Sequence, residues 1–151
     1  NRAQFSSIMQ EIALIDLHFQ LDADPENLGL LNAVASFYNI KKEYKKSLDY
    51  SIQVLQQEPL NKQALKNIVF GYRGRGEAGD VLDYGNRYAM IEPDDINLQY
   101  IFGEIFAKTL RCQQAVPYFQ QVIKKDDTYR NAESLLNECL SYQRGEDDGD
   151  A

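Results

Sequence analysis

The sequence contains no tryptophan, a single histidine and only two cysteines among its 151 residues. His18 alone cannot build a two-histidine metal site, and Cys112 and Cys139 lie 27 positions apart rather than in a C-x-x-C pair. No serine–histidine–acid set and no pair of carboxylates has a spacing that indicates catalysis. We therefore expect no catalytic residue, no metal and no cofactor. We interpret the protein as a non-enzyme in which His18 is structural.

Long apolar runs and excess positive charge are also missing. No run approaches the roughly 20 apolar residues that cross a bilayer, so no membrane insertion is expected. The formal charge of −7 argues against nucleic acid as the main partner. No signal-peptide apolar region opens the chain, and the chain starts at Asn1 without a methionine, so we interpret it as a processed chain or part of a longer one. The compartment stays open, with the cytoplasm slightly favoured over the periplasm.

Proline is scarce, but three of the four prolines are periodic. Pro25, Pro59 and Pro93 are 34 residues apart, and Asp127 continues the register without a proline. Each interval contains two amphipathic segments separated by a short polar break. A fixed period of this length indicates a repeat architecture in which every unit is one supersecondary motif.

Stepping by 34 residues aligns side chains of one type in five columns. In the first segment of each repeat, one column contains apolar side chains, one contains small side chains and one contains aromatic side chains. In the second segment, one column is made mostly of small side chains and one of apolar side chains. Their members are Val34/Ile68/Phe102/Leu136, Ala35/Val69/Gly103, Tyr38/Tyr72/Phe106, Ser47/Val81/Ala115 and Val54/Tyr88/Val122. The small columns are what a close helix crossing requires.

These columns resemble the tetratricopeptide repeat (TPR) family, whose unit is a helix–turn–helix of this length. The resemblance covers residues 28–129 well, although Leu31, Leu65 or Gln99 replaces the first-helix tryptophan often seen in the family. It implies an all-α, right-handed solenoid of antiparallel helix pairs. The expected parts are an N-terminal helix segment (1–27), three repeats (28–61, 62–95, 96–129), a capping helix (130–143) and a disordered acidic tail (144–151).

The predicted helix pairs span residues 28–41 with 44–57, 62–73 with 78–91, and 96–109 with 113–125. Asn27, Asn61 and Asp95 are the expected N-caps, and Pro117 should fall near the first turn of its helix. A further helix over residues 3–20 has an apolar stripe at Phe5, Ile8, Ile12, Ile15 and Phe19. It either caps the stack or is the second helix of a preceding, incomplete repeat.

Two local patterns have competing interpretations. Residues 74–79 spell G-x-G-x-x-G, but a dinucleotide site needs a preceding strand, so we interpret them as a glycine-rich turn between helices. Cys112 and Cys139 are interpreted as small buried residues in a reducing compartment. A disulfide between the last repeat and the terminal helix is the alternative.

The resemblance implies that the first helix of each repeat lines a concave surface where a partner binds. The predicted binding residues are Asn32, Ser36, Asn39, Lys66, Asn67, Phe70, Arg73, Tyr100, Glu104 and Lys108. Phe70 and Tyr100 are large aromatics on a face expected to meet water, and Tyr100 should border the same hollow as Lys66. The alternative is that these rings pack on neighbouring helices.

Charge gives a second indication of the partner. The segments 28–42, 62–76 and 96–110 contain seven cations and one acid, a net +6 in a chain of −7. This distribution favours an acidic segment with an apolar anchor. The carboxylate clamp of chaperone-binding TPR proteins is expected to be absent, because only Asn67 matches it.

Three functions are compatible with these observations. The first is a scaffold that binds a protein or peptide segment in its groove. The second is a small acidic chaperone of the kind that serves type III secretion translocators, for which a homodimer would be expected. The third is a fragment of a longer structural solenoid.

Overall fold

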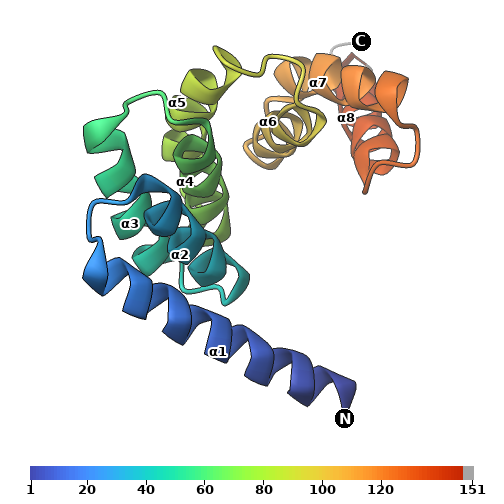
Figure 1. The fold of residues 1–151 in the computed structure, drawn as a ribbon. Helices are drawn as coiled ribbons and strands as arrows, with labels where there is room; N and C mark the ends of the chain where they lie inside the picture. The colour runs from blue at the N-terminus through green and yellow to red at the C-terminus, as the bar shows by residue number, and fades with distance from the viewer. Residues whose placement is uncertain (148–151) are drawn as a thin grey trace. The chain divides into compact units, whose positions relative to one another are not determined.

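Residues 1–147 are described in the computed structural model, and they form eight α-helices and no strand (Figure 1). The helices are α1 (Arg2–Ala23), α2 (Leu28–Ile40), α3 (Tyr44–Gln57), α4 (Lys62–Arg75), α5 (Ala78–Ala89), α6 (Ile96–Lys108), α7 (Cys112–Lys125) and α8 (Ala132–Asp147). The six helices of the three repeats lie within two residues of their predicted bounds. No helix in this range is long and apolar enough to cross a bilayer.

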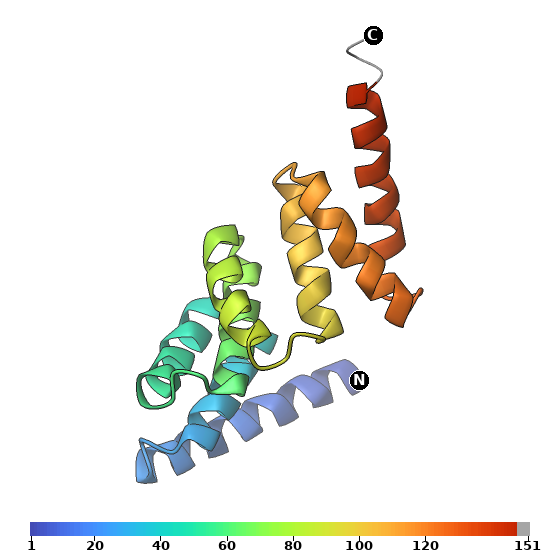
Figure 2. The same ribbon diagram turned by 90° about the horizontal axis from the view of Figure 1, so that it is seen from above.

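The chain forms two compact units, residues 1–91 with helices α1–α5 and residues from 92 onward with α6–α8. In the first unit each helix packs on the next one along the chain, and α2 also packs on α4. In the second unit α7 packs on both α6 and α8 (Figure 2). The first helices α2 and α4 therefore lie side by side within the first unit.

The N-caps fix where the first helix of each repeat begins. The side-chain oxygens of Asn27, Asn61 and Asp95 accept hydrogen bonds from backbone N–H groups three residues ahead, at 2.9–3.0 Å. Each bond satisfies one of the N–H groups that a helix leaves unpaired at its start. The predicted caps are confirmed.

The repeat columns form the core. Val34 and Ile68 are fully buried, and a Cβ placed on Gly103 would lie 2.8 Å from the ring of Phe119. A small residue is therefore required where α6 approaches α7. Pro117 differs from its expected position, because α7 begins at Cys112 and the proline is its sixth residue, inside the helix.

The glycines of the G-x-G-x-x-G pattern lie around the junction of α4 and α5. Gly76 caps α4 in the left-handed conformation, with φ of 74°, where a side chain would be strained. Gly74 lies inside α4, and an added Cβ would come within 2.6 Å of the Tyr44 ring. The pattern thus begins in the last turn of α4 and ends in α5, and only residues 76–77 of the predicted turn lie between the two helices.

Cys112 and Cys139 are joined in a disulfide, with their Cα atoms 5.1 Å apart. The preferred interpretation of two unpaired buried thiols is therefore wrong. A sequence separation of 27 did not reveal that α7 and α8 bring the two side chains together.

The terminal helix is longer than predicted. α8 continues through Asp147 instead of ending at residue 143, so the first four residues of the predicted tail are helical. Residues 148–151, the rest of that tail, lie outside the described residues.

α1 has two apolar faces, and the one predicted from periodicity is not the one that packs. Leu14 and Leu21 are buried against α2, whereas all five residues of the predicted stripe are exposed. Two polar contacts strengthen the packed side: His18 Nε2 lies 2.9 Å from the Tyr38 hydroxyl, and Lys41 Nζ lies 2.7 Å from a Glu11 carboxylate oxygen. α1 thus covers α2 with one side and presents the stripe to solvent.

Candidate functional site

Four predicted binding residues of the first unit form one hydrogen-bonded cluster between α2 and α4, which we call the asparagine network. Asn67 on α4 donates to the backbone oxygen of Asn32 at 3.2 Å and accepts from the Ser36 hydroxyl at 3.0 Å. Asn39 donates to the backbone oxygen of Asn67 at 3.0 Å. These bonds fix the spacing of the two first helices.

Two residues outside the predicted set belong to the same network. Asn32 donates to the side chain of Asn61 at 3.1 Å, and Gln63 donates to Asn67 Oδ1 at 3.3 Å. Asn61 was identified from the sequence only as an N-cap. Its side-chain oxygen serves both purposes, because it also accepts from the backbone of Ala64.

The asparagine network is buried, contrary to the expectation that these side chains face water. Asn32, Asn39 and Asn67 are 9%, 6% and 5% exposed. Oδ1 of Asn32 and Oδ1 of Asn39 accept no hydrogen bond from any described residue. A buried acceptor without a donor costs roughly 1–3 kcal/mol. The two unpaired oxygens therefore lower the free energy of unfolding, although the network joins α2 to α4.

An apolar residue between two cations lies on the exposed side of α4. Phe70 is 41% exposed, Lys66 is exposed and Arg73 is half-buried. Their spacing of four and three residues places them on one face of the helix. The sequence predicted this row, and Phe70 is partly open to solvent as expected.

The predicted residues of the third repeat belong to the second unit and differ from that expectation. The Tyr100 ring packs edge-on against Phe119 and Tyr129, with the Arg130 guanidinium 5.3 Å from its centre. Tyr100 is therefore a core residue of its unit rather than a solvent-facing aromatic. Glu104 is largely buried and lies 3.5 Å from Lys108 Nζ. The predicted hollow shared by Tyr100 and Lys66 stays a prediction.

One set of aromatic contacts was missed in the sequence. Tyr38 stacks on Tyr50, Tyr72 on Tyr84 and Phe106 on Tyr118, with ring centres 5.6–5.8 Å apart. Burial raises the pKa of Tyr50 and of Tyr72 above the ordinary value of tyrosine. Stepping by 34 from Tyr50 would have revealed the second aromatic column.

No protein-family model matches the sequence, and a search of curated proteins finds no match. Solved structures do resemble it. A TPR protein from Parabacteroides merdae superposes with a TM-score of 0.75 at 16% identity, over 91% of this chain and 56% of that one. YrrB, described as a TPR protein with an unusual peptide-binding site, gives 0.76 at 18% identity, over 95% and 74%. A thermophilic TPR protein of Thermus thermophilus gives 0.67 at 16%, over 93% and 78%.

The chain has the TPR fold. At these identities the likeness concerns the fold alone, and the chain spans little more than half of the Parabacteroides protein. The all-α arrangement of antiparallel TPR helix pairs predicted from the sequence is confirmed.

Three residues at the predicted carboxylate-clamp positions lie within the asparagine network of this TPR fold. Asn32 and Ser36 occupy positions where clamp members have other residues, and Asn67, the one match, is engaged in the asparagine network. The absence of a working clamp stays a prediction for binding experiments.

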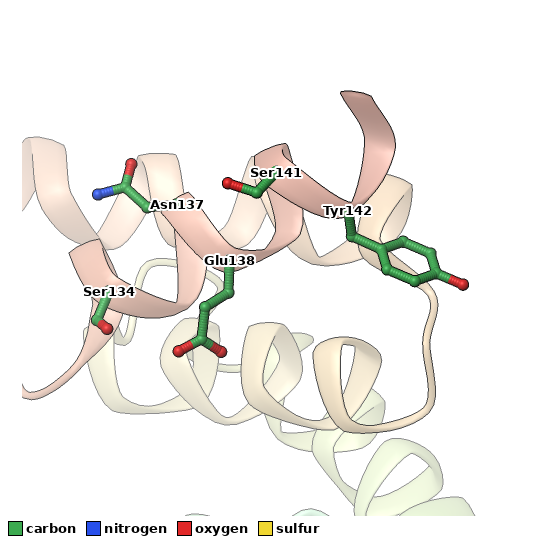
Figure 3. A pocket seen from close by; sticks show the side chains of 5 residues that line it. All are labelled: Ser134, Asn137, Glu138, Ser141 and Tyr142. Carbon is green, nitrogen blue, oxygen red and sulfur yellow. The ribbon is translucent and has the colours of Figure 1, made fainter. Parts of the chain in front are cut away.

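The surface of α8 contains a shallow hollow. It is lined by Ser134, Asn137, Glu138, Ser141 and Tyr142, all from this one TPR-flanking helix (Figure 3). A surface built by a single helix cannot enclose a small molecule, as binding sites usually do. No group of three or more metal-ligating side chains lies within residues 1–147.

Proposed function

We propose that the protein is a non-catalytic interaction module that binds a segment of another protein across α2 and α4. The observation that carries this proposal is Phe70, an aromatic side chain that stays 41% exposed between Lys66 and Arg73. Hydrogen bonds of the asparagine network hold α4, the helix that carries Phe70, against α2, so a partner would meet a preorganised surface.

The charge on the same two helices supports an acidic partner. Segments 28–42 and 62–76 contain six cations and no acid. Lys41 and Arg75 pair with Glu11 and Glu77, so part of this charge is compensated within the unit. Lys66 is exposed beside Phe70. An apolar anchor flanked by carboxylates would cover the ring and meet the cations.

The fold is compatible with this proposal. YrrB is described as having a peptide-binding site, and a protein or peptide ligand is the corresponding expectation for this chain. The earlier alternatives, a secretion chaperone and a fragment of a longer solenoid, would use the same surface. They differ in partner and in chain length.

Peptide arrays test the proposal without a known partner. We expect peptides with a central Phe or Leu between Asp and Glu residues to bind, and Phe70→Ala to weaken binding by about 1–3 kcal/mol. Leu60→Ala, which truncates a side chain of similar exposure in a turn of the same unit, should leave binding unchanged.

Kinetics separate the apolar contribution from the electrostatic one. The double variant Lys66→Glu, Arg73→Glu should slow association and remove most of the salt dependence, since exposed charges act mainly on the encounter. If Phe70→Ala and the double variant both bind as the wild type does, with unchanged helix content, the proposed surface is wrong.

A further inference from the structure

The outer face of α1 is the largest exposed apolar feature of the first unit. Six large side chains lie on it, each between 48% and 75% exposed: Phe5, Ile8, Met9, Ile12, Ile15 and Phe19. We call this set the α1 stripe. Ile12 and the packed Leu14 are two positions apart, about 200° around a helix, so stripe and packed face lie on opposite sides.

The repeat register shows that the α1 stripe is specific to this helix. Ile12, Ile15 and Phe19 each stand 34 residues before a position in α3, and those positions are Lys46, Asp49 and Gln53. All three are exposed, as is usual for the solvent-facing side of a repeat helix. In α1 the same positions are apolar, so this side of α1 differs from the ordinary outer surface of a repeat.

We propose that the α1 stripe is a homodimer interface in which two α1 helices pack antiparallel around a twofold axis. The spacing within the stripe is 3, 4, 3 and 4 residues from Phe5 to Phe19, the pattern of a helix–helix seam. The stripe is also nearly palindromic about Ile12. Phe5 and Phe19 lie seven residues on either side of Ile12, and Met9 and Ile15 lie three.

A twofold contact makes use of this symmetry. It places Ile12 against its own copy, Phe5 against Phe19 of the second copy, and Met9 against Ile15. Five of the six residues then meet an apolar partner, whereas Ile8 lies opposite Asp16 of the second copy. Such self-complementarity is what distinguishes a second copy of the chain from an unrelated partner helix.

The area of the α1 stripe suits a dimer. Large side chains contribute about 150–250 Å² each, so at these exposures the stripe offers roughly 600 Å² per copy. Two copies would bury about 1,200 Å², the lower end of specific interfaces. The largest apolar patch of a typical monomer measures about 300–600 Å² and is often functional, so the α1 stripe lies at the upper end of that range.

A membrane surface fits the α1 stripe less well. Helices that lie on membranes have lysine and arginine beside the apolar face. α1 has Arg2 at its start but Glu11, Asp16 and Asp22 along its length. These acids would be repelled by anionic lipids.

Light scattering coupled to size exclusion tests the proposal on the wild-type chain without any ligand. Twice the monomer mass of 17.3 kDa is expected at micromolar concentration. Ile12→Glu should raise the dimer dissociation constant at least about 100-fold, because it places two buried charges face to face. Leu60→Glu, at 55% exposure against 53% for Ile12, is the matched control and should stay dimeric.

The orientation has its own test. Phe5→Cys and Phe19→Cys chains, mixed and oxidised, should form a covalent dimer, whereas Phe5→Cys alone should not. A monomeric wild type, or a dimer that persists in both Ile12→Glu and Ile15→Glu, would overturn the proposal. Cross-linking of Phe5→Cys to itself would overturn the antiparallel arrangement. Phe70→Ala should not change the mass, so this result is separable from the proposed peptide surface.

Discussion

The first and last helices, α1 and α8, differ in the polarity of the side chains that they expose to solvent. α8 presents four polar side chains and one aromatic ring to solvent, namely Ser134, Asn137, Glu138, Ser141 and Tyr142, whereas α1 presents the apolar stripe. Repeat arrays need terminal helices with a polar outer side, because a repeat face without a neighbour would otherwise be apolar and exposed. α8 meets this requirement and α1 does not. This difference is the reason that a second copy of the chain is proposed to cover the α1 stripe and none is proposed for α8.

The two helices are also attached differently. α8 is joined covalently to α7 through Cys112–Cys139, while α1 is held to α2 by Leu14, Leu21 and a few polar contacts. The contribution of each attachment can be measured separately, and three experiments test whether the comparison holds.

The largest expected effect comes from the disulfide. Reduction should lower the free energy of unfolding of the second unit by about 3–4 kcal/mol, because the bond closes a loop of 27 residues in the unfolded chain. Urea unfolding with and without reductant measures this. The double variant Cys112→Ala, Cys139→Ala should be insensitive to reductant. If oxidised and reduced wild type unfold at the same urea concentration, the covalent attachment of α8 has no energetic role.

A smaller effect is expected from the packed side of α1, with its exposed neighbour as control. Leu14→Ala should cost about 2–3 kcal/mol, because it leaves a cavity against α2. Ile15→Ala should change the stability of the monomer by no more than about 0.5 kcal/mol. Both are measured by urea unfolding at a concentration too low for association. Equal losses for the two variants would show that α1 packs on the stripe side.

The smallest effect concerns the ion pair between α1 and α2. The hydrogen bond to Glu11 raises the pKa of Lys41 above its usual value of 10.5. A raised pKa means that the bridge stabilises the fold below pH 10.5 and ceases to do so as the pH rises through the folded-state value. Glu11→Gln should therefore lower the melting temperature slightly at pH 8. The wild-type and variant curves should converge in strong alkali. Glu26→Gln serves as the control. If the difference in melting temperature between the wild type and Glu11→Gln grew with pH, the ion pair would not stabilise the fold in the way described.

The sequence was most informative where the repeat register and local chemistry agree. Asn61 and Asp95 begin helices because their side chains cap them, and Ile68 is buried because its column is apolar in every repeat. Such rules depend only on residues close in sequence and need no knowledge of which helices pack together. The stacked Tyr50 column belongs to the same class and was available from the period.

The errors concern contacts between elements that are distant in sequence. Periodicity identified an apolar stripe on α1 but did not show which of two apolar faces packs on α2. Asn32 and Asn67 looked solvent-facing, because polarity does not reveal that they hydrogen-bond to one another across α2 and α4. Tyr100 looked exposed for the same reason, since its partners Phe119 and Tyr129 come from later in the chain.

The α1 stripe shares no residue with the asparagine network or with Phe70. In a dimer joined through α1, the dimer interface would therefore use no residue of the proposed peptide-binding surface. Such a dimer would present two of these surfaces. A partner with two suitable segments could then bind with an avidity roughly 10²–10⁴-fold above that of one segment, provided its linker spans both surfaces. One face of α1 would thus hold the first unit together, while its other face would make binding of the partner bivalent.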